Sequence, residues 1–187
     1  MVLKNGQSTE TVPVHKSFIC YYSPYFDAVF NGSFAEGETQ RMELEDAPPA
    51  AFNMFVNWLY TQDIADRELD LPDSNNLIDL WILADRFIVP RLQNQAMELI
   101  LDKKMRAGHI SVKTHIRAYE NTARGSKLRS ILVDRRLNSM LVSTRPAHQC
   151  QWPPVEMLEE MLAICIARMP KTTDFLDHPP EHYQIEE

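Results

Sequence analysis

Residues 77–88 have the sequence Leu77-Ile78-Asp79-Leu80-Trp81-Ile82-Leu83-Ala84-Asp85-Arg86-Phe87-Ile88. This segment carries two apolar stripes at helical spacing: Leu77, Leu80, Trp81, Ala84 and Ile88 on one, Ile78 and Ile82 on the other. A helix that is apolar on most of its circumference is buried, whereas a surface helix has one apolar stripe. The sequence therefore predicts that this helix lies at the centre of the fold.

Helical patterns also precede the central segment. From Lys16 the apolar spacing is helical, Pro24 divides it into two short helices, and Gly32 ends the second. Pro48-Pro49 opens a further helix. Its apolar residues follow the helical period: Phe52, Phe55, Val56 and Leu59. The polar residues 62–75 predict a loop that ends in an N-cap.

Strand signals are confined to short segments near the N-terminus. Asn5-Gly6 is a typical hairpin turn, and Val12 and Val14 alternate with other residues after it, which predicts a hairpin over residues 2–15. Met42 and Leu44 alternate with charged residues and predict one more strand. A small sheet among helices makes an α+β fold the expected class.

The helical signals continue past Pro90, which begins a helix running towards Gly108. Three more helical patterns follow at about 111–122, 126–141 and 154–169. The last is expected to bury one face: Leu158, Met161, Leu162, Cys165 and Met169. We therefore predict a first domain over residues 1–105, an all-helical extension over 106–169 and a disordered tail over 170–187.

Composition narrows the class of protein. The 187 residues suit one core with an appendage, and the net charge of −7 disfavours binding to nucleic acid. The basic segment Arg124 to Arg136 is interpreted as an amphipathic helix with a solvated basic face, and Glu159-Glu160 as part of another solvated face. The chain lacks a signal-peptide run at its start and a membrane-spanning segment, so we expect an intracellular protein without membrane contact.

Catalytic and metal-binding patterns were sought as well. Cys20, Cys150 and Cys165 form no CxxC pair, so we expect small buried side chains rather than disulfides or a zinc site. No glycine-rich phosphate loop and no nucleophile elbow occurs, and His109 and His115 are not spaced as metal ligands on one helical face. The sequence therefore predicts no enzyme activity, no metal and no cofactor. His15 is expected to be a structural group with hydrogen-bond partners.

Short motifs occur in order along the first hundred residues: Val14-His15-Lys16, Ser23-Pro24-Tyr25-Phe26, Phe34-Ala35-Glu36, Met42-Glu43-Leu44-Glu45-Asp46, Ala51-Phe52, Trp58-Leu59-Tyr60-Thr61 and Leu83-Ala84-Asp85-Arg86-Phe87. In residue type and spacing they resemble the BTB/POZ domain over about residues 1–105. This resemblance implies a non-enzymatic protein-interaction module. Members of that family form homodimers and other assemblies, and many are substrate adaptors for cullin-based ubiquitin ligases.

Two further features bear on the branch of the family and on its assembly. Tyr119-Glu120-Asn121-Thr122 and Ser126-Lys127-Leu128-Arg129 resemble the helical extension of the filamentous-fungal BTB proteins. The family usually has Ser-Asp or a similar pair before its first strand, and an exchanged N-terminal strand often completes the homodimer. This chain starts at Val2-Leu3, inside that strand, so we expect either that the start is misplaced or that part of the dimer contact is lost, and the resemblance leaves the homodimer open.

Phe34-Ala35-Glu36 is the candidate partner site. It is expected in the loop after the second helix, where cullin-binding members of the family carry a hydrophobic residue, any residue, and then Glu. An exposed apolar anchor beside an orienting carboxylate is a usual combination in protein interfaces. Alternatively, Phe34 folds back onto the core and Glu36 is merely solvated. The competing functions are a self-associating scaffold and a transcription-related BTB protein that binds no cullin.

Overall fold

A small sheet and a cluster of helices make up the computed structural model, which describes residues 1–5, 8–64, 72–102, 110–142 and 152–168. The strands are β1 (Val2–Asn5), β2 (Ser8–Thr11) and β3 (Glu43–Glu45), in the order β2-β1-β3. β1 pairs antiparallel with β2 and parallel with β3, where Leu3 lies opposite Leu44. Both leucines are fully buried, so this face of the sheet covers the core.

The hairpin differs from the expected one in its second strand. The ladder ends at Thr11, and Val12 and Val14 lie beyond it, although the Val12 amide still donates to the Met1 carbonyl at 2.9 Å. Pro13 has no amide hydrogen and so cannot extend the ladder. The strand is therefore made of the polar residues 8–11, which carry no apolar alternation to reveal it.

Three of the described helices lie between β2 and β3, namely α1 (Lys16–Tyr22), α2 (Pro24–Asn31) and α3 (Ala35–Thr39), and β3 is followed by α4 (Pro49–Thr61), α5 (Ser74–Arg86) and α6 (Pro90–Leu101). Proline begins α2, α4 and α6, at the position where a missing amide costs nothing. Asp73 caps α5 by accepting from the Asn75 amide at 2.9 Å. The division at Pro24, the end at Gly32 and the predicted N-cap are confirmed.

Helix α5 lies at the centre, as its two apolar stripes predicted, but Ile88, which was expected on one of the stripes, lies beyond the helix and is 53% exposed. Every residue from Leu77 to Ala84 is buried. Around Phe87, at its C-terminal end, the rings of Phe26, Phe52 and Phe55 pack with centroids 4.6 to 6.4 Å away. Ser23 fastens the α1–α2 corner to this end, because its hydroxyl donates to the Phe87 carbonyl at 2.6 Å.

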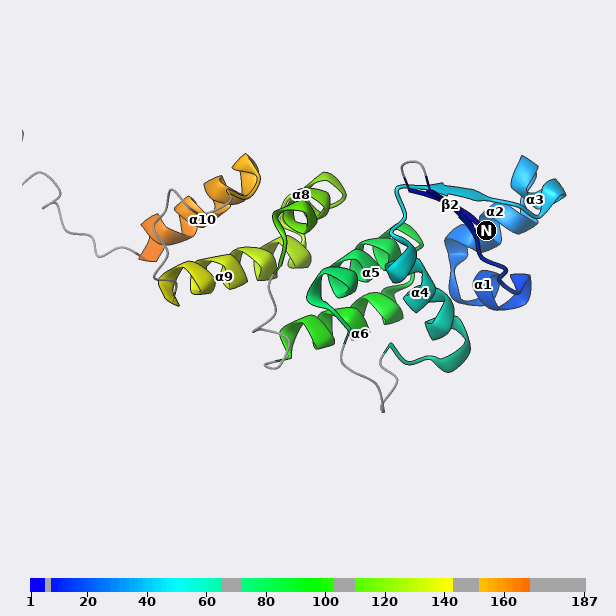
Figure 1. Cartoon of the computed structure of the whole chain (residues 1–187), viewed down its shortest axis with the longest axis horizontal. Helices are drawn as coiled ribbons and strands as arrows, with labels where there is room; N and C mark the ends of the chain where they lie inside the picture. The colour runs from blue at the N-terminus through cyan, green and yellow to red at the C-terminus, as the bar shows by residue number, and fades with distance from the viewer. Residues whose placement is uncertain (6–7, 65–71, 103–109, 143–151, 169–187) are drawn as a thin grey trace, which may run out of the picture.

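Three helices extend the molecule away from the sheet: α8 (Val112–Glu120), α9 (Lys127–Val142) and α10 (Val155–Arg168). In Figure 1 the sheet lies at one end, α5 and α6 in the middle, and α9 and α10 at the other end. α8 contacts α5 through Arg117, which forms an ion pair with Asp79, and through Asn75. The Asn75 Oδ1 accepts from the Ser111 amide at 2.9 Å and the Thr114 hydroxyl at 2.6 Å.

The buried face of α10 agrees only in part with the expected one. Met161 is buried and Leu158 packs against the core as expected, but Leu162 is 60% exposed, and Met157, which was not in the expected set, is buried. Two apolar rows one residue apart compete in this helix, and the row containing Met157, Met161 and Ile164 is the one that packs on the core cluster. Glu160 turns inwards with it, so the interpretation of Glu159-Glu160 as a solvated face is wrong for Glu160.

Other expectations are only partly met. Cys20 and Cys165 are half-buried rather than buried, and Cys150 lies outside the described residues. Burial raises the pKa of the Cys20 thiol, whose Sγ lies 3.6 Å from the Phe26 carbonyl oxygen. The predicted disordered tail, residues 170–187, and the segment around Gly108 also lie outside the described residues.

Candidate partner-binding surface

Phe34-Ala35-Glu36 does not lie in a loop, as the sequence suggested, but at the start of α3. Phe34 is the N-cap residue, and its carbonyl accepts from the Gly37 amide at 2.9 Å. Its side chain is 59% exposed, so it is not folded back onto the core. Glu36, in the first helical turn, is half-buried. An apolar ring and a carboxylate therefore stand two residues apart on the surface.

Close approach of two glycines sets the position of α3. A Cβ atom added to Gly37 would lie 2.6 Å from the Gly32 carbonyl oxygen, closer than real contacts allow. Gly32 ends α2, so the missing side chain lets α3 pack directly on the end of that helix. The exposed ring of Phe34 is thereby held on a fixed backbone rather than on a free loop, which reduces the entropy lost when a partner binds.

A second group of exposed aromatic side chains lies on α1 and at the end of α4. Phe18 and Tyr60 are 41% and 42% exposed, with their ring centroids 4.9 Å apart, and Tyr21 is 81% exposed. His15 contributes its Nδ1 atom, 2.8 Å from the Tyr60 hydroxyl. The expectation of a structural histidine is confirmed. The helical spacing that begins at Lys16 gave no signal for the exposure of these rings.

Comparison with known proteins identifies the family. A family model for the BTB/POZ domain matches residues 1–104, more than half of the chain. The chain belongs to the BTB/POZ domain family. It is therefore a protein-interaction module and not an enzyme.

Individual relatives of this BTB/POZ chain are similar only over that region. Human Kelch-like protein 30 is 42% identical over 50 residues, which are 27% of this chain and 9% of the relative. Zebrafish BTB/POZ domain-containing protein 6-B is 32% identical over 85 residues, 46% of this chain and 16% of the relative. Human BTB/POZ domain-containing protein 6 is 31% identical over 93 residues, again 16% of the relative. The matches thus span less than a fifth of these relatives.

The polar residues singled out within the BTB/POZ region connect its elements. Asp85 Oδ1 accepts from Gln93 Nε2 at 2.9 Å and so joins α5 to α6. Arg86 donates to the Glu45 carbonyl at 3.2 Å and so joins α5 to β3. His115 lies beyond the BTB/POZ match, where it is buried with Nδ1 2.8 Å from the Ser111 carbonyl oxygen; His109 is outside the described residues.

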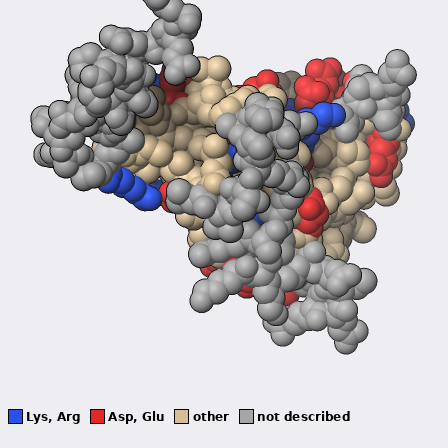
Figure 2. Space-filling view, turned by 60° about the vertical axis from the view of Figure 1, so that its left-hand side comes forward, with Lys and Arg blue, Asp and Glu red and all other residues tan. Residues whose placement is uncertain are grey.

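In the described part of the chain, no group of three or more His, Cys, Asp or Glu side chains is arranged to hold a metal ion. Within the same ranges, none of the helices combines the length and apolar character needed to cross a membrane. On the face in Figure 2, Lys and Arg atoms appear in small separate groups among the visible residues.

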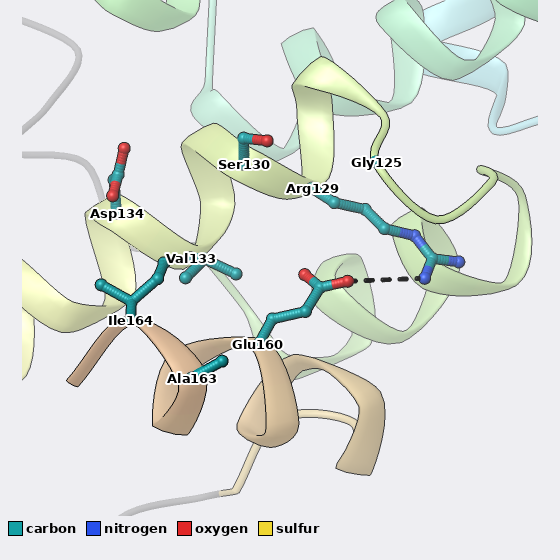
Figure 3. Close-up of a pocket in the computed structure, with 8 residues that line it drawn as sticks. All are labelled: Gly125, Arg129, Ser130, Val133, Asp134, Glu160, Ala163 and Ile164. Carbon is teal, nitrogen blue, oxygen red and sulfur yellow. Dashed lines mark ion pairs between the residues drawn. The ribbon is translucent and has the colours of Figure 1, made fainter. Parts of the chain in front are cut away.

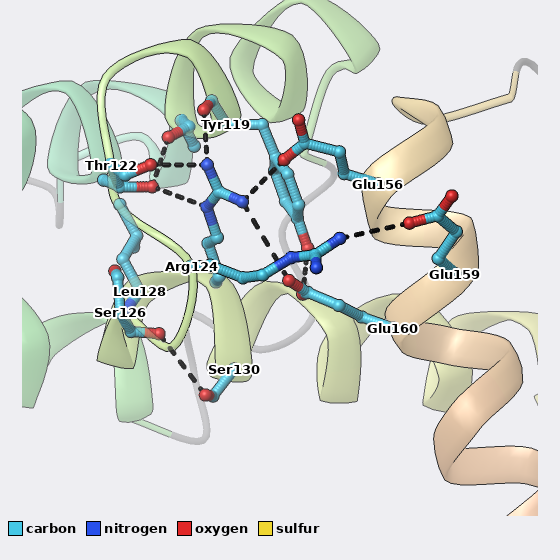
Figure 4. A network of polar contacts seen from close by, with 11 residues as sticks. Tyr119, Thr122, Arg124, Ser126, Leu128, Ser130, Glu156, Glu159 and Glu160 are labelled. Atoms are coloured by element: carbon cyan, nitrogen blue, oxygen red, sulfur yellow. Dashed lines mark hydrogen bonds and ion pairs between the residues drawn. The ribbon is translucent and has the colours of Figure 1, made fainter.

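The basic segment after the BTB/POZ match is only partly the solvated face that we expected: Arg124 and Lys127 are exposed, but Arg129 is 5% exposed. Its guanidinium donates to Thr122 Oγ1 at 3.0 Å, to the Tyr119 carbonyl at 2.6 Å and to Glu156 Oε2 at 2.7 Å, and also to the Thr122 carbonyl. Figure 4 labels these partners, Tyr119, Thr122 and Glu156. It stacks on the Tyr119 ring, 4.3 Å from the centroid. Arg129 therefore joins α8, α9 and α10 from within.

Tyr119 completes this network on the other side. Its hydroxyl donates to Glu160 Oε2 at 2.6 Å, and burial together with this carboxylate raises the pKa of the phenol. Arg124, by contrast, is exposed and forms a surface ion pair with Glu159 at 3.2 Å. The charge pattern of the sequence could not separate the two arginines, since both lie in the same basic run.

Proposed function

We propose that this BTB/POZ protein is a substrate adaptor of a cullin-based ubiquitin ligase, with Phe34 and Glu36 as cullin contacts. The observation that carries the proposal is the exposed Phe34 ring at the start of α3. Burying a phenylalanine side chain in a partner contributes on the order of 2 kcal/mol. In the family, a hydrophobic residue followed two positions later by Glu marks the cullin-binding members. Such an adaptor would work inside the cell, in the cytoplasm or the nucleus.

In this proposal the two parts of the chain bind different partners. The BTB/POZ region up to about residue 105 contacts the cullin, and the helices of residues 106–169 recruit or support the substrate. The joint between α5 and α8 supports a fixed geometry, because Asp79, Asn75 and their partners tie the extension to the most buried helix. A ligase adaptor needs such a fixed distance between its two binding surfaces.

The double variant Phe34→Ala with Glu36→Ala tests the cullin proposal. The tagged full chain is recovered from cells of its source, and the eluate is probed for a cullin by immunoblot. We expect the native chain to retain the cullin and the double variant to lose it, because both the anchor and its carboxylate are gone. Glu38→Ala, on the same short helix, is the matched control and should retain it.

Absence of a cullin from the native sample would contradict the proposal, and so would equal recovery with the double variant. Circular dichroism of each variant shows whether α3 and the core remain folded. Because Phe34 is already exposed, its removal should leave the melting temperature within a few degrees of the native value.

Self-association is a second candidate, and the exposed aromatic side chains of α1 favour it. Phe18 and Tyr21 present two rings on one short helix, and aromatic residues are enriched in protein interfaces. Light scattering over a range of concentrations measures the mass in solution. A dimer that Tyr21→Ser dissociates would support this function, whereas a monomer at all concentrations would exclude it.

A further inference from the structure

Helix α10 is apolar on two opposite faces, and only one of them is covered within the described part of the chain. The inner face packs on the core cluster through Met157 and Met161. On the outer face Val155, Leu162 and Ile166 are 72%, 60% and 60% exposed. A helix that is apolar on two faces is normally covered on both. The outer face of α10 is therefore a candidate contact surface.

The outer face of α10 has the spacing of a coiled-coil seam. Its four positions follow one another at intervals of four, three and four residues: Val155, Glu159, Leu162 and Ile166. They lie within about 60° of one another around the helix axis, whereas a helix that packs on a globular core carries an apolar stripe of about 100° or more. A seam this narrow fits the matching seam of one other helix, whose side chains insert between its own.

Glu159 is the charged position of this seam, and its charge is compensated within the molecule. Its carboxylate accepts from the Arg124 guanidinium at 3.2 Å (Figure 4). The seam therefore carries no net charge and does not repel an identical seam, as a row of unpaired carboxylates would. A single polar residue in a coiled-coil seam is tolerated and fixes the register of the two helices.

The groove between α9 and α10, of about 400 Å³, lies on a different face. Its lining from α10 consists of Glu160, Ala163 and Ile164, which Figure 3 shows on the side of the helix that faces α9. None of the four seam residues lines this groove. The seam is turned away from that lining, so a helix can approach it from outside.

The sequences on either side of α10 do not supply a matching seam. Residues 143–151 contain no Val, Leu, Ile, Met, Phe or Tyr and no Trp. Residues 169–187 contain no row of apolar residues with the seam spacing, and Pro170, Pro179 and Pro180 interrupt any helical pattern there. A second copy of the chain, by contrast, brings an identical seam.

The exposed area limits how strong a pairing of two seams can be. The three apolar seam residues and Trp152, which is 52% exposed just before the helix, present on the order of 500 Å² of surface, as large as the main patches of monomeric proteins. Two copies would remove roughly 1,000 Å² from water, the lower limit for a specific complex. The pairing is therefore expected to be weak and to depend on concentration.

We propose that the protein associates with a second copy of itself through an antiparallel pairing of the two α10 helices along this seam. A two-fold contact places the same surface on both sides, so Val155 of one copy lies opposite Ile166 of the other. The antiparallel arrangement also places the N-terminus of each helix beside the C-terminus of the other, which is the favourable orientation of two helix dipoles.

This surface is separate from the aromatic side chains of α1 and from Phe34 at the start of α3, which lie at the sheet end of the molecule (Figure 1). A dimer formed at α10 leaves both of them free. If the protein is an adaptor, such a dimer would present two copies of the Phe34 site.

Sedimentation equilibrium of the full chain over a wide range of concentrations tests the proposal. The chain carries Tyr21→Ser, so that any association through α1 is removed. We expect the mass to rise with concentration from that of one chain towards that of two. Leu162→Glu and, separately, Ile166→Glu place a charge in the seam. Each should raise the Kd of the dimer about tenfold or more, which corresponds to 1.4 kcal/mol.

A matched control makes the same change outside the seam. Ile116→Glu alters an isoleucine of α8 that is 41% exposed, and it should keep the Kd of the dimer. Arg124→Glu leaves Glu159 without its counter-charge in both copies and should weaken the dimer, although it changes no seam residue. Circular dichroism shows that each variant is folded. Phe34→Ala with Glu36→Ala should keep the dimer, so failure of the cullin proposal is distinguishable from failure of this one.

The mass of a single chain at every concentration would overturn the proposal, and so would a dimer that Leu162→Glu and Ile166→Glu leave unchanged. Phe175→Ser with Leu176→Ser tests whether the residues after α10 cover the seam instead. We expect this variant to associate as the native chain does. Stronger association would overturn the proposal, because the seam would then be covered by the chain itself.

Discussion

Ile88 has a backbone conformation that isoleucine seldom adopts. It links α5 to α6 with φ at +56°, and its side chain is 53% exposed. A β-branched residue at positive φ is strained, at a cost of about 1–3 kcal/mol. Two backbone hydrogen bonds next to Ile88 maintain this strained conformation. The Ile88 amide donates to the Asp85 carbonyl at 3.1 Å, and the Val89 amide to the Ala84 carbonyl at 2.8 Å.

Replacing Ile88 by asparagine should therefore stabilise the fold. Asparagine tolerates positive φ, and little buried apolar area is lost, so we expect the free energy of unfolding to rise by about 1 kcal/mol. Urea denaturation measures the change. Ile116→Asn is the control, because Ile116 is similarly exposed but helical, and it should give no gain. A loss of stability in Ile88→Asn would show that its side chain contributes more than the strain costs.

The three helices of the extension depend on one buried side chain. Arg129 satisfies the carbonyls of Tyr119 and Thr122 at the end of α8 and reaches Glu156 on α10. The planar guanidinium carries five N–H donors in a fixed arrangement and so serves all four acceptors, whereas an ammonium group has only three donors on a flexible stem.

Arg129→Lys is expected to be costly although it conserves charge. It leaves buried acceptors without donors, and we expect the free energy of unfolding to fall by about 2–4 kcal/mol. Thermal unfolding followed by circular dichroism measures it. Arg124→Lys is the same substitution in an exposed ion pair and should change stability by less than about 0.5 kcal/mol. Equal effects at the two positions would contradict the role assigned to Arg129.

Elements with a strong local signal were predictable from the sequence. The two apolar stripes of α5 predict a buried helix, and the prolines at the starts of α2, α4 and α6 predict where these helices begin. The face of α10 was predictable only in part, since two adjacent apolar rows that share Met161 fit the helical period equally well. The helix α3 was missed because its residues, Ala35–Thr39, have no apolar periodicity. The exposure of Phe34 depends on the close contact between Gly37 and the Gly32 carbonyl oxygen. The pattern of apolar residues in the sequence does not reveal such a contact.

The BTB/POZ region and the extension meet at α5 and α8, where Asp79 is 5% exposed. Burial raises the pKa of this carboxyl, and Arg117 opposes the rise. Because the folded-state pKa lies above the unfolded value, protonation favours the folded state. This contribution is fully present at low pH and is lost as the pH rises through the folded pKa. The ion pair with Arg117 limits that loss at neutral pH.

Arg117→Gln should therefore destabilise the protein in a pH-dependent way. At pH 7 we expect a loss of about 1–2 kcal/mol, kept small because Arg117 is partly exposed. Near pH 4 the loss should shrink, because the raised pKa of Asp79 lets this carboxyl take up its proton as the pH falls, which removes the charge that Arg117 pairs with. Urea denaturation at both pH values tests this, with Asp79→Asn as the background that removes the pH dependence. An equal loss at both pH values would contradict the account.

The parallel pairing of β1 with β3 also constrains how the chain folds. Leu3 must meet Leu44, so a loop of about forty residues has to close before the sheet is complete. The β1–β2 hairpin and the α1–α2 corner need only local contacts, which form faster. Closing a long loop costs conformational entropy that later contacts must repay. We therefore expect β3 to join the sheet after α1 and α2 have formed, and the speed of refolding to be limited by that late step.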